Sequence, residues 1–357
     1  MNSKIRVLTI DGGGILGIVP AMILQALERK IRHHANDPDA KIVDYFDFVA
    51  GTSTGGIIAA LLLMPDKQDP KRPRYSTTDI VGFYRDKGPD IFRTSWWLKA
   101  LGGVGLLRNR YSADHLESLL LHYLEETKLN QLIKPSLIPA YNLEKASTCF
   151  FCSHNHIDGI VPERNFLLRD ICRATSAAPS YFKAAAFTSD SQETHVCVDG
   201  GVFANNPTLC TIAEVGKTDK NYTPINMNLL SLGTGKLRAT SLSPSFLKRI
   251  TLLNIPTLIS IMMDGVAETT DYITHNLFNN LGVEDQYLRL EPEMTDGRVR
   301  QMDNASPKNI QKLQEITEEF LQKNDQKLEK WAQRLIPTPE VEGLESMQAP
   351  VLDYSKK

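Results

Sequence analysis

The sequence is poor in cysteine and in long apolar runs, and it carries no strong surplus of charge. Five cysteines among 357 residues are a sparse and odd number, which argues against a disulfide framework and favours a reducing compartment. No stretch reaches the roughly eighteen consecutive apolar residues of a membrane span, and the first residues lack the basic start and apolar core of a signal peptide. Lys and Arg number 40 against 42 Asp and Glu, so no basic field favours nucleic acid as a partner. We therefore expect a cytoplasmic protein.

The sequence does contain alternating strand-like and helix-like segments, which is the pattern of an α/β protein. Strand-like runs at 5–10 and 45–50 are each followed by a helical pattern, at 15–34 and 55–64. Further strands are predicted at 136–142, 148–152, 194–198 and 227–232. This order predicts a mainly parallel central sheet flanked by helices.

Four later segments have patterns of their own. Residues 89–110 mix tryptophans and glycine-rich apolar stretches with basic residues, which indicates either a mobile flap that faces lipid or a surface loop packed on the core. Residues 251–267 predict an apolar helix too short to span a bilayer. Residues 306–335 predict one long amphipathic helix packed on a main domain of 1–305, and 336–357 predict a disordered tail.

The most informative motif is the G-x-S-x-G of Gly51, Ser53 and Gly55. It directly follows the apolar run that ends at Ala50 and directly precedes a helical apolar run. Such an elbow holds its serine on a tight strand-to-helix turn, where flanking glycines admit the close approach of the backbone. Ser53 is therefore a candidate nucleophile.

A second glycine cluster follows the first predicted strand. Gly12, Gly13, Gly14 and Gly17 lie between that strand and a helical stretch. Exposed backbone N–H groups at a glycine-rich helix start attract negative charge. That charge is either a phosphate or a tetrahedral oxyanion, and the pattern alone does not separate the two.

A serine nucleophile needs a base, and none of the eight histidines lies in a convincing motif. The better candidate is Asp199, which precedes Gly200 and Gly201 at the end of a predicted strand, because active sites form at the carboxyl ends of strands in α/β sheets. A partly desolvated carboxylate within hydrogen-bond reach of a serine can act as general base. The alternative interpretation of this Asp-Gly-Gly is a simple turn.

Cys149 and Cys152, followed by His154 and His156, suggest a redox or zinc site at first sight. Residues three apart in a strand point to opposite faces, and the segment resembles the second arm of a hairpin. We therefore expect structural cysteines in a strand pair rather than a metal site.

Taken together, these motifs closely resemble the patatin-like phospholipase family. The resemblance covers about residues 4–320 and rests on the segments 11–17, 44–47, 51–55, 174–182, 199–201, 202–207 and 232–235. It implies a three-layer patatin-like fold and a lipid acyl hydrolase that needs neither metal nor organic cofactor. The implied substrate is a phospholipid or other glycerolipid, reached by transient membrane contact.

The resemblance also implies roles for individual residues. Ser53 would attack the ester carbonyl, Asp199 would take its proton, and the amides of Gly12, Gly13 and Gly14 would form the oxyanion hole. One position departs from the family, since many members carry Lys or Arg where this chain has Leu16. The preference among anionic lipids is expected to change more than the activity, because backbone N–H groups carry the stabilisation.

Two alternatives remain open at this point. The spacing of Gly12, Gly14 and Gly17 after a strand is also the fingerprint of a nucleotide-binding protein, although the next predicted strand runs into the serine elbow instead of ending on a ribose-binding acid. The second alternative is a membrane-degrading effector released by a small-molecule activator, since some bacterial patatin-like enzymes that this chain resembles are antiviral effectors switched on by cyclic nucleotides.

Overall fold

The apolar runs of the sequence form a central sheet, which we describe from a computed structural model. The structure describes residues 4–92, 110–156, 164–238 and 255–336. Within these ranges the sheet has eight strands. They are β1 (Ile5–Ile10), β2 (Phe48–Gly51), β3 (Ser136–Asn142), β4 (Ser147–Cys152), β5 (Ala185–Thr188), β6 (Thr194–Asp199), β7 (Met227–Leu232) and β9 (Tyr287–Leu290). The short strands β8 (Lys236–Leu237) and β10 (Glu293–Met294) pair separately with each other.

Helices connect and cover these strands. They are α1 (Ile18–Ala35), α2 (Thr54–Leu63), α3 (Thr77–Gly82), α4 (Gly88–Ile91), α6 (Asp114–Leu124), α7 (Leu168–Thr175), α8 (Gly201–Ala204), α9 (Thr208–Thr218), α11 (Ile255–Asn280), α12 (Pro307–Lys323) and α13 (Asp325–Leu335). Short 3-10 turns are η1 (Gly14–Gly17), η2 (Ile42–Tyr45), η4 (Leu129–Gln131), η5 (Ser153–His156), η7 (Pro224–Asn226) and η9 (Glu284–Gln286), and η3 (Phe83–Lys87) is a π turn.

The strand order is β5-β6-β3-β2-β1-β7-β9, with β4 on the other edge of β3. The five strands from β3 to β9 are parallel, and β4, β5 and β6 add an antiparallel extension. On one edge of β3, its first residues pair with β2 and its last residues pair with β6. Since β6 runs antiparallel to β3, the carboxyl ends of β2 and β6 meet end to end along that edge.

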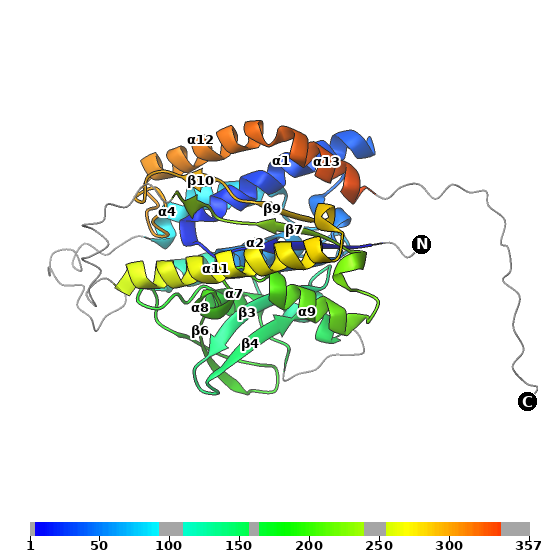
Figure 1. Ribbon diagram of the computed structural model, residues 1–357. Coiled ribbons are helices and arrows are strands. Elements are labelled where there is room, and N and C mark those ends of the chain that lie inside the picture. The colour runs from blue at the N-terminus through cyan, green and yellow to red at the C-terminus, as the bar shows by residue number, and fades with distance from the viewer. Residues whose placement is uncertain (1–3, 93–109, 157–163, 239–254, 337–357) are drawn as a thin grey trace, which may run out of the picture.

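Each face of the sheet has its own apolar core. In β1, Leu8 and Ile10 pack in the larger core beneath α1, α2 and α7, whereas Ile5 and Val7 pack in a smaller core with side chains of α9 and α11. Figure 1 shows α12 and α13 beside α1 along the top and α11 in front of the sheet. The predicted α/β class, with a mainly parallel sheet flanked by helices, is confirmed.

Some predicted elements differ in their bounds. The strand predicted at 45–50 begins only at Phe48, because residues 42–45 form a 3-10 turn. The helix predicted at 251–267 runs on to Asn280. The single helix predicted for 306–335 is two helices, because Asn324 leaves the helical conformation and its side-chain amide donates to the carbonyl of Phe320 at 2.9 Å. Residues 93–109 of the predicted flap and 337–357 of the predicted tail lie outside the described residues.

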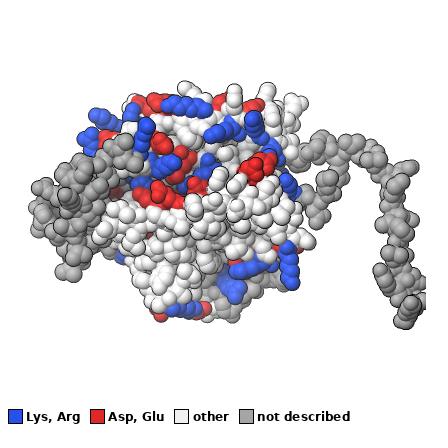
Figure 2. All heavy atoms as spheres, viewed as in Figure 1, with Lys and Arg blue, Asp and Glu red and all other residues white. Residues whose placement is uncertain are grey.

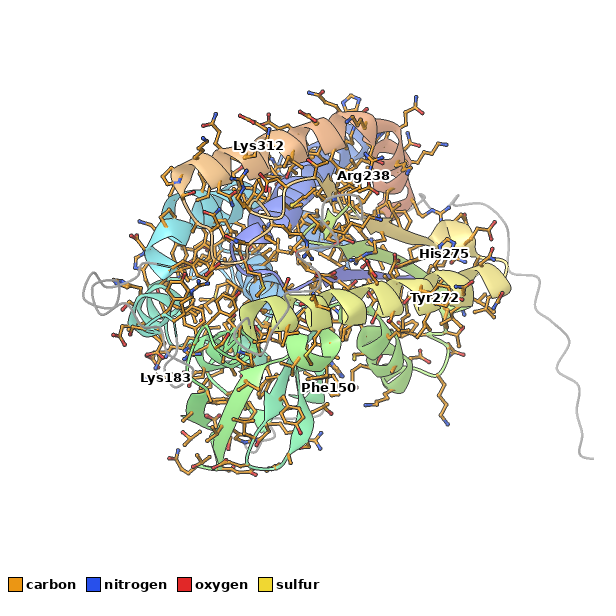
Figure 3. All side chains as sticks on the ribbon, turned by 60° about the vertical axis from the view of Figure 1, so that its left-hand side comes forward. Phe150, Lys183, Arg238, Tyr272, His275 and Lys312 are labelled. Atoms are coloured by element: carbon orange, nitrogen blue, oxygen red, sulfur yellow. The ribbon has the colours of Figure 1, made fainter. Side chains whose placement is uncertain are left out.

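The outer side of α11 is unusually apolar. Ile261, Met262, Tyr272 and Ile273 are all exposed on this helix. Figure 2 shows acidic and basic side chains gathered across the middle and upper part of this face and mostly uncharged surface below them, and Figure 3 shows Tyr272 and His275 on α11. Among the helices of the described ranges, α11 included, none is long and apolar enough to cross a membrane.

Candidate active site

Ser53 lies at the turn between β2 and α2 in a strained backbone conformation. Its φ of 54° and ψ of −120° are unusual for a residue with a side chain and cost on the order of 1–3 kcal/mol. A Cβ at Gly51 would lie 2.0 Å from the carbonyl oxygen of Gly55, and one at Gly55 would lie 2.2 Å from that of Ile10. Only glycine fits at both positions, so the motif forms the predicted sharp turn.

The end-to-end meeting of β2 and β6 brings Asp199 to this serine. Ser53 Oγ donates a hydrogen bond of 2.7 Å to Asp199 Oδ2, although the residues are 146 positions apart. Asp199 is the last residue of β6 and pairs with Ala140 of β3. The chain then turns at Gly200, where a Cβ would lie 2.3 Å from the carbonyl oxygen of Pro139. The Asp-Gly-Gly segment is thus a turn as well as the carrier of a carboxylate at Ser53.

Asp199 is almost completely buried, with 1% of its surface exposed. Its Oδ1 accepts a hydrogen bond of 2.7 Å from the amide of Gly201. Burial raises the pKa of Asp199 to about 7, while the Gly201 amide and the Ser53 hydroxyl act in the opposite direction. A carboxyl group with this pKa can both accept and return a proton near neutral pH.

Thr175, at the end of α7, holds the elbow from the other side. Its Oγ1 accepts a hydrogen bond of 2.9 Å from the Ser53 amide and donates one of 2.6 Å to the carbonyl of Pro139. One hydroxyl therefore connects the nucleophile candidate to β3. Sequence reasoning did not single out this residue, although it lies in the segment 174–182 that carries part of the family resemblance.

The glycine loop lies against Ser53, since a Cβ at Gly12 would be 3.2 Å from the Cβ of Ser53. The Gly12 amide donates to the carbonyl of Asn205 at 3.0 Å, so it is not free to bind an oxyanion. In the part of the chain that the structure describes, the amides of Gly13 and Gly14 have no hydrogen-bond partner. Gly14 has a φ of +60°, which favours glycine. Of the three predicted donors, two remain available.

A buried ion pair holds Asp11, the residue that precedes the glycine loop. Arg289 of β9 contacts Asp11, the residue before Gly12, at 2.7 Å and also contacts Glu291 at 3.0 Å and Ser231 Oγ at 2.8 Å. Burial opposes the charge of Arg289, but Asp11 and Glu291 outweigh it and hold the pKa of the guanidinium well above its usual value. Leu16, the residue that departs from the family pattern, is buried in the larger core.

The remaining motif glycines pack beside these groups. A Cβ at Gly17 would lie 2.3 Å from Thr54 Oγ1, so the start of α1 can approach α2 closely. Gly201 begins α8 and supplies the amide to Asp199.

No histidine of the described residues hydrogen-bonds to Ser53 or Asp199. His195 lies in β6, where its Nδ1 is 3.1 Å from Asn142 Nδ2 and its ring stacks on Phe187. His34 pairs with Glu329 of α13. Among the described residues, Asp199 is the titratable side chain that hydrogen-bonds to Ser53.

An apolar cavity of about 50 Å³ opens beside the pair. Ser53, Asp199 and Gly14 lie on its wall, and most of its other lining is apolar or aromatic. These lining side chains include Ile57, Phe83, Ile91, Phe92, Leu116, Tyr181 and Phe182. The wall next to Ser53 is therefore mostly apolar.

The chain is similar to known proteins over most of its length. The family model "Patatin-like phospholipase" matches residues 8–211, a range that contains both Ser53 and Asp199. Patatin-like protein 4 of Arabidopsis thaliana is 32% identical over 344 residues, which cover 90% of this chain and 84% of the relative. Probable inactive patatin-like protein 9 of Arabidopsis thaliana is 32% identical over 351 residues, which cover 94% of this chain and 87% of the relative.

Among solved structures, VipD from Legionella pneumophila aligns with 89% of this chain and 67% of its own, at 12% identity. Its TM-score of 0.34 supports no further argument. The family model and the relatives, which match most of the chain, show that it belongs to the patatin-like phospholipase family.

Proposed function

We propose that this protein is a lipid acyl hydrolase that uses Ser53 as nucleophile and Asp199 as general base. The observation that carries the proposal is the 2.7 Å hydrogen bond from the strained elbow serine to a buried carboxyl group whose pKa is about 7. Family membership alone does not decide activity, because a relative of similar identity is named as probably inactive. The presence of both residues in contact supports an active enzyme.

In the proposed first step, Ser53 Oγ attacks the ester carbonyl while its proton passes to Asp199 Oδ2. The negative charge that develops on the carbonyl oxygen is stabilised by the amides of Gly13 and Gly14. The tetrahedral intermediate then collapses, the alcohol leaves with the proton from Asp199, and the acyl group stays on Ser53. Water next attacks this acyl-enzyme and gives one proton to Asp199, which returns it to Ser53 Oγ as the second tetrahedral intermediate collapses and releases the fatty acid.

The cavity supports a substrate with an apolar acyl chain. Ile57, Phe83 and Phe182 face it beside Ser53, so a hydrocarbon chain would bury apolar surface there at roughly 25 cal/mol per Å². We infer that phospholipids or other glycerolipids are the substrates and that the protein contacts a lipid surface transiently. The exposed apolar side of α11 supports this contact, because the inner side of the same segment packs near the site: Met263 neighbours Gly201.

The decisive experiment measures fatty-acid release from mixed phospholipid vesicles by wild type, Ser53→Ala and Asp199→Asn. We expect each variant to lose at least about 10³-fold in kcat while it keeps its folded circular dichroism spectrum. Ser189→Ala is the matched control, because this buried serine lies in the turn between β5 and β6, away from the cavity. An active Asp199→Asn variant would contradict the assignment of the base, and a folded but silent wild type would contradict the assigned substrate class.

A further inference from the structure

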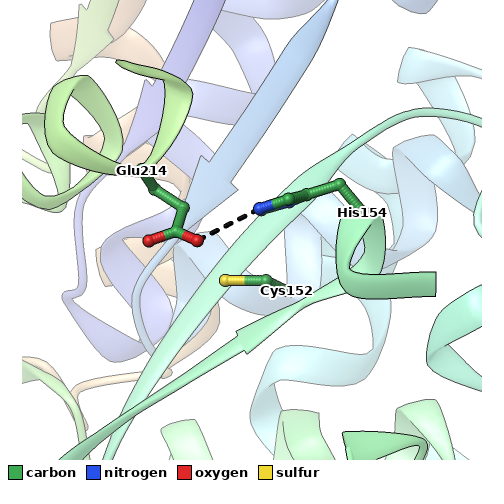
Figure 4. A group of neighbouring side chains, drawn as sticks. All are labelled: Cys152, His154 and Glu214. Carbon is green, nitrogen blue, oxygen red and sulfur yellow. Dashed lines mark hydrogen bonds and ion pairs between the residues drawn. The ribbon is translucent and has the colours of Figure 1, made fainter. Parts of the chain in front are cut away.

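A second cluster of reactive side chains lies away from the cavity at Ser53. Cys152 ends β4, His154 lies in η5 just after it, and Glu214 lies on α9. Each residue offers one ligand atom, and these three atoms all lie within 4.8 Å of one another. Figure 4 shows the three side chains converging from these separate elements. None of them lines the cavity described above.

The cluster is well shielded from solvent. Cys152 has 2% of its surface exposed, and the side chains of His154 and Glu214 have 6% and 11% exposed. Cys152 belongs to the smaller core, with Phe48 and Val215 around it. Buried groups of this kind need partners, because removing them from water is costly.

Within the cluster, one ring nitrogen of His154 has a partner and the other has none. His154 Nε2 lies 3.1 Å from Glu214 Oε1, and Lys217 donates to Glu214 Oε2 at 2.5 Å. His154 Nδ1 is buried and has no hydrogen-bond partner among the described residues, so no bond there fixes the tautomer of the ring. His154 can therefore carry its proton at Nδ1 and offer Nε2 as an electron-pair donor.

The donor set matches one class of metal ion. A thiolate, an imidazole and a carboxylate are the three ligand types that Zn²⁺ takes in proteins, whereas Mg²⁺ and Ca²⁺ prefer oxygen alone. Two nitrogen or oxygen ligands on tetrahedral zinc lie roughly 3.3 Å apart, given bonds of about 2.0 Å. The 3.1 Å between His154 Nε2 and Glu214 Oε1 is already close to that separation.

We propose that Cys152, His154 and Glu214 form a Zn²⁺ site that fastens the end of β4 and η5 to α9. The Cys152 thiol gives its proton to solvent as the sulfur–zinc bond forms, His154 binds through Nε2, and Glu214 binds through Oε1 while Lys217 keeps Oε2. Thiolate and carboxylate together balance the charge of the ion, and a water molecule completes the tetrahedron. The site stabilises the fold and takes no part in ester hydrolysis.

The test uses the full-length protein, first stripped with a chelator and then titrated with Co²⁺ as a spectroscopic substitute for Zn²⁺. We expect one equivalent to bind, with a thiolate-to-cobalt charge-transfer band and the intense visible bands of four-coordinate cobalt. One equivalent of Zn²⁺ should remove both signals. Zn²⁺ should also raise the midpoint of thermal unfolding of the wild type.

Variants separate this site from other sites that bind metal. Cys152→Ala should abolish the charge-transfer band, and Glu214→Gln should weaken Zn²⁺ binding by more than about 100-fold. Cys149→Ser is the matched control, because Cys149 is only three residues away on β4 but packs against the other core, and it should behave as wild type. A wild type that binds no Co²⁺, or a Cys152→Ala variant that keeps the charge-transfer band, would overturn the proposal. If Cys152→Ala does not fold, an unchanged Zn²⁺ affinity of the Glu214→Gln variant would overturn the proposal instead.

Discussion

Asp199 is the residue whose ionisation should control the proposed reaction. Only the carboxylate can accept the proton of Ser53, and the pKa of Asp199 is about 7. We therefore expect kcat/KM to rise about tenfold per pH unit below pH 7 and to level off above it. The measurement is a pH profile on a soluble monomeric ester. A profile that stays flat from pH 5 to 8 would show that Asp199 is not the base.

The same pKa has a consequence for stability. Between pH 4 and 7 the folded protein keeps a proton on Asp199 that the unfolded chain releases, so the free energy of unfolding of the wild type should fall as pH rises through this window. Asp199→Asn lacks this proton equilibrium. Urea unfolding at several pH values should therefore show the wild type losing up to about 4 kcal/mol relative to the variant.

Thr175 is a positioning residue whose hydroxyl can be tested by itself. Thr175→Val keeps the shape of the side chain but leaves the buried Ser53 amide and the Pro139 carbonyl without their partner. We expect a loss of about 1–3 kcal/mol in the free energy of unfolding and a fall in kcat of more than tenfold. Thr175→Ser retains the hydroxyl and should restore most of the activity. Equal activity of the valine and serine variants would show that this hydrogen bond does not position Ser53.

At the scale of single elements, two helical glycines should respond in opposite ways to alanine. A Cβ at Gly55 of α2 would lie 2.2 Å from the backbone oxygen of Ile10, so α2 would have to move away from β1. Gly216 of α9 has Tyr222 O as its nearest neighbour, at 3.6 Å, which leaves room for a methyl group. We expect Gly55→Ala to lower the free energy of unfolding by more than about 3 kcal/mol and Gly216→Ala to raise it by about 0.5–1 kcal/mol. Denaturant unfolding checks both, and similar values for the two variants would contradict the close packing at Gly55.

Elements with strong apolar patterns were predictable from the sequence. The strands β1, β3, β4, β6 and β7 appear close to their predicted bounds, because their apolar residues either alternate or form short continuous runs. The edge strands β5 and β9 were missed. β5 has only four residues, and β9 carries Arg289 among its apolar residues, so neither gives a clear pattern.

Those residues of the candidate site that lie in short sequence motifs were predictable from the sequence. The elbow serine and the strand-end aspartate could be proposed from their motifs, but Thr175 and Arg289 act through contacts that only the fold creates. The occupied amide of Gly12 likewise depends on Asn205, a contact across the structure. For the second cluster, the opposite orientation of Cys149 and Cys152 was anticipated, but Glu214 is 60 residues beyond His154 and completes it from another helix.

At the scale of the whole molecule, the apolar outer side of α11 predicts a preference for aggregated lipid. Replacing both Ile261 and Met262 with serine should lower the rate on vesicles several-fold and leave the rate on a monomeric ester unchanged, because the change removes apolar contact with lipid and not the reacting groups. Tyr272 and Ile273 lie about three turns further along the helix, away from Met263 beside Gly201, so serines there should lower the rate on vesicles less. Equal wild-type rates above and below the aggregation threshold of the substrate would exclude this preference.

The end-to-end meeting of β2 and β6 also sets how much of the chain must be translated before the candidate site can form. Ser53 leaves the ribosome 146 residues before Asp199. Arg289, which braces the glycine loop, follows Asp11 by 278 residues. A nascent chain, or a fragment from interrupted synthesis, thus carries the proposed nucleophile without the proposed base and without the arginine that holds the glycine loop. On the proposed mechanism, such incomplete copies should not hydrolyse lipid esters.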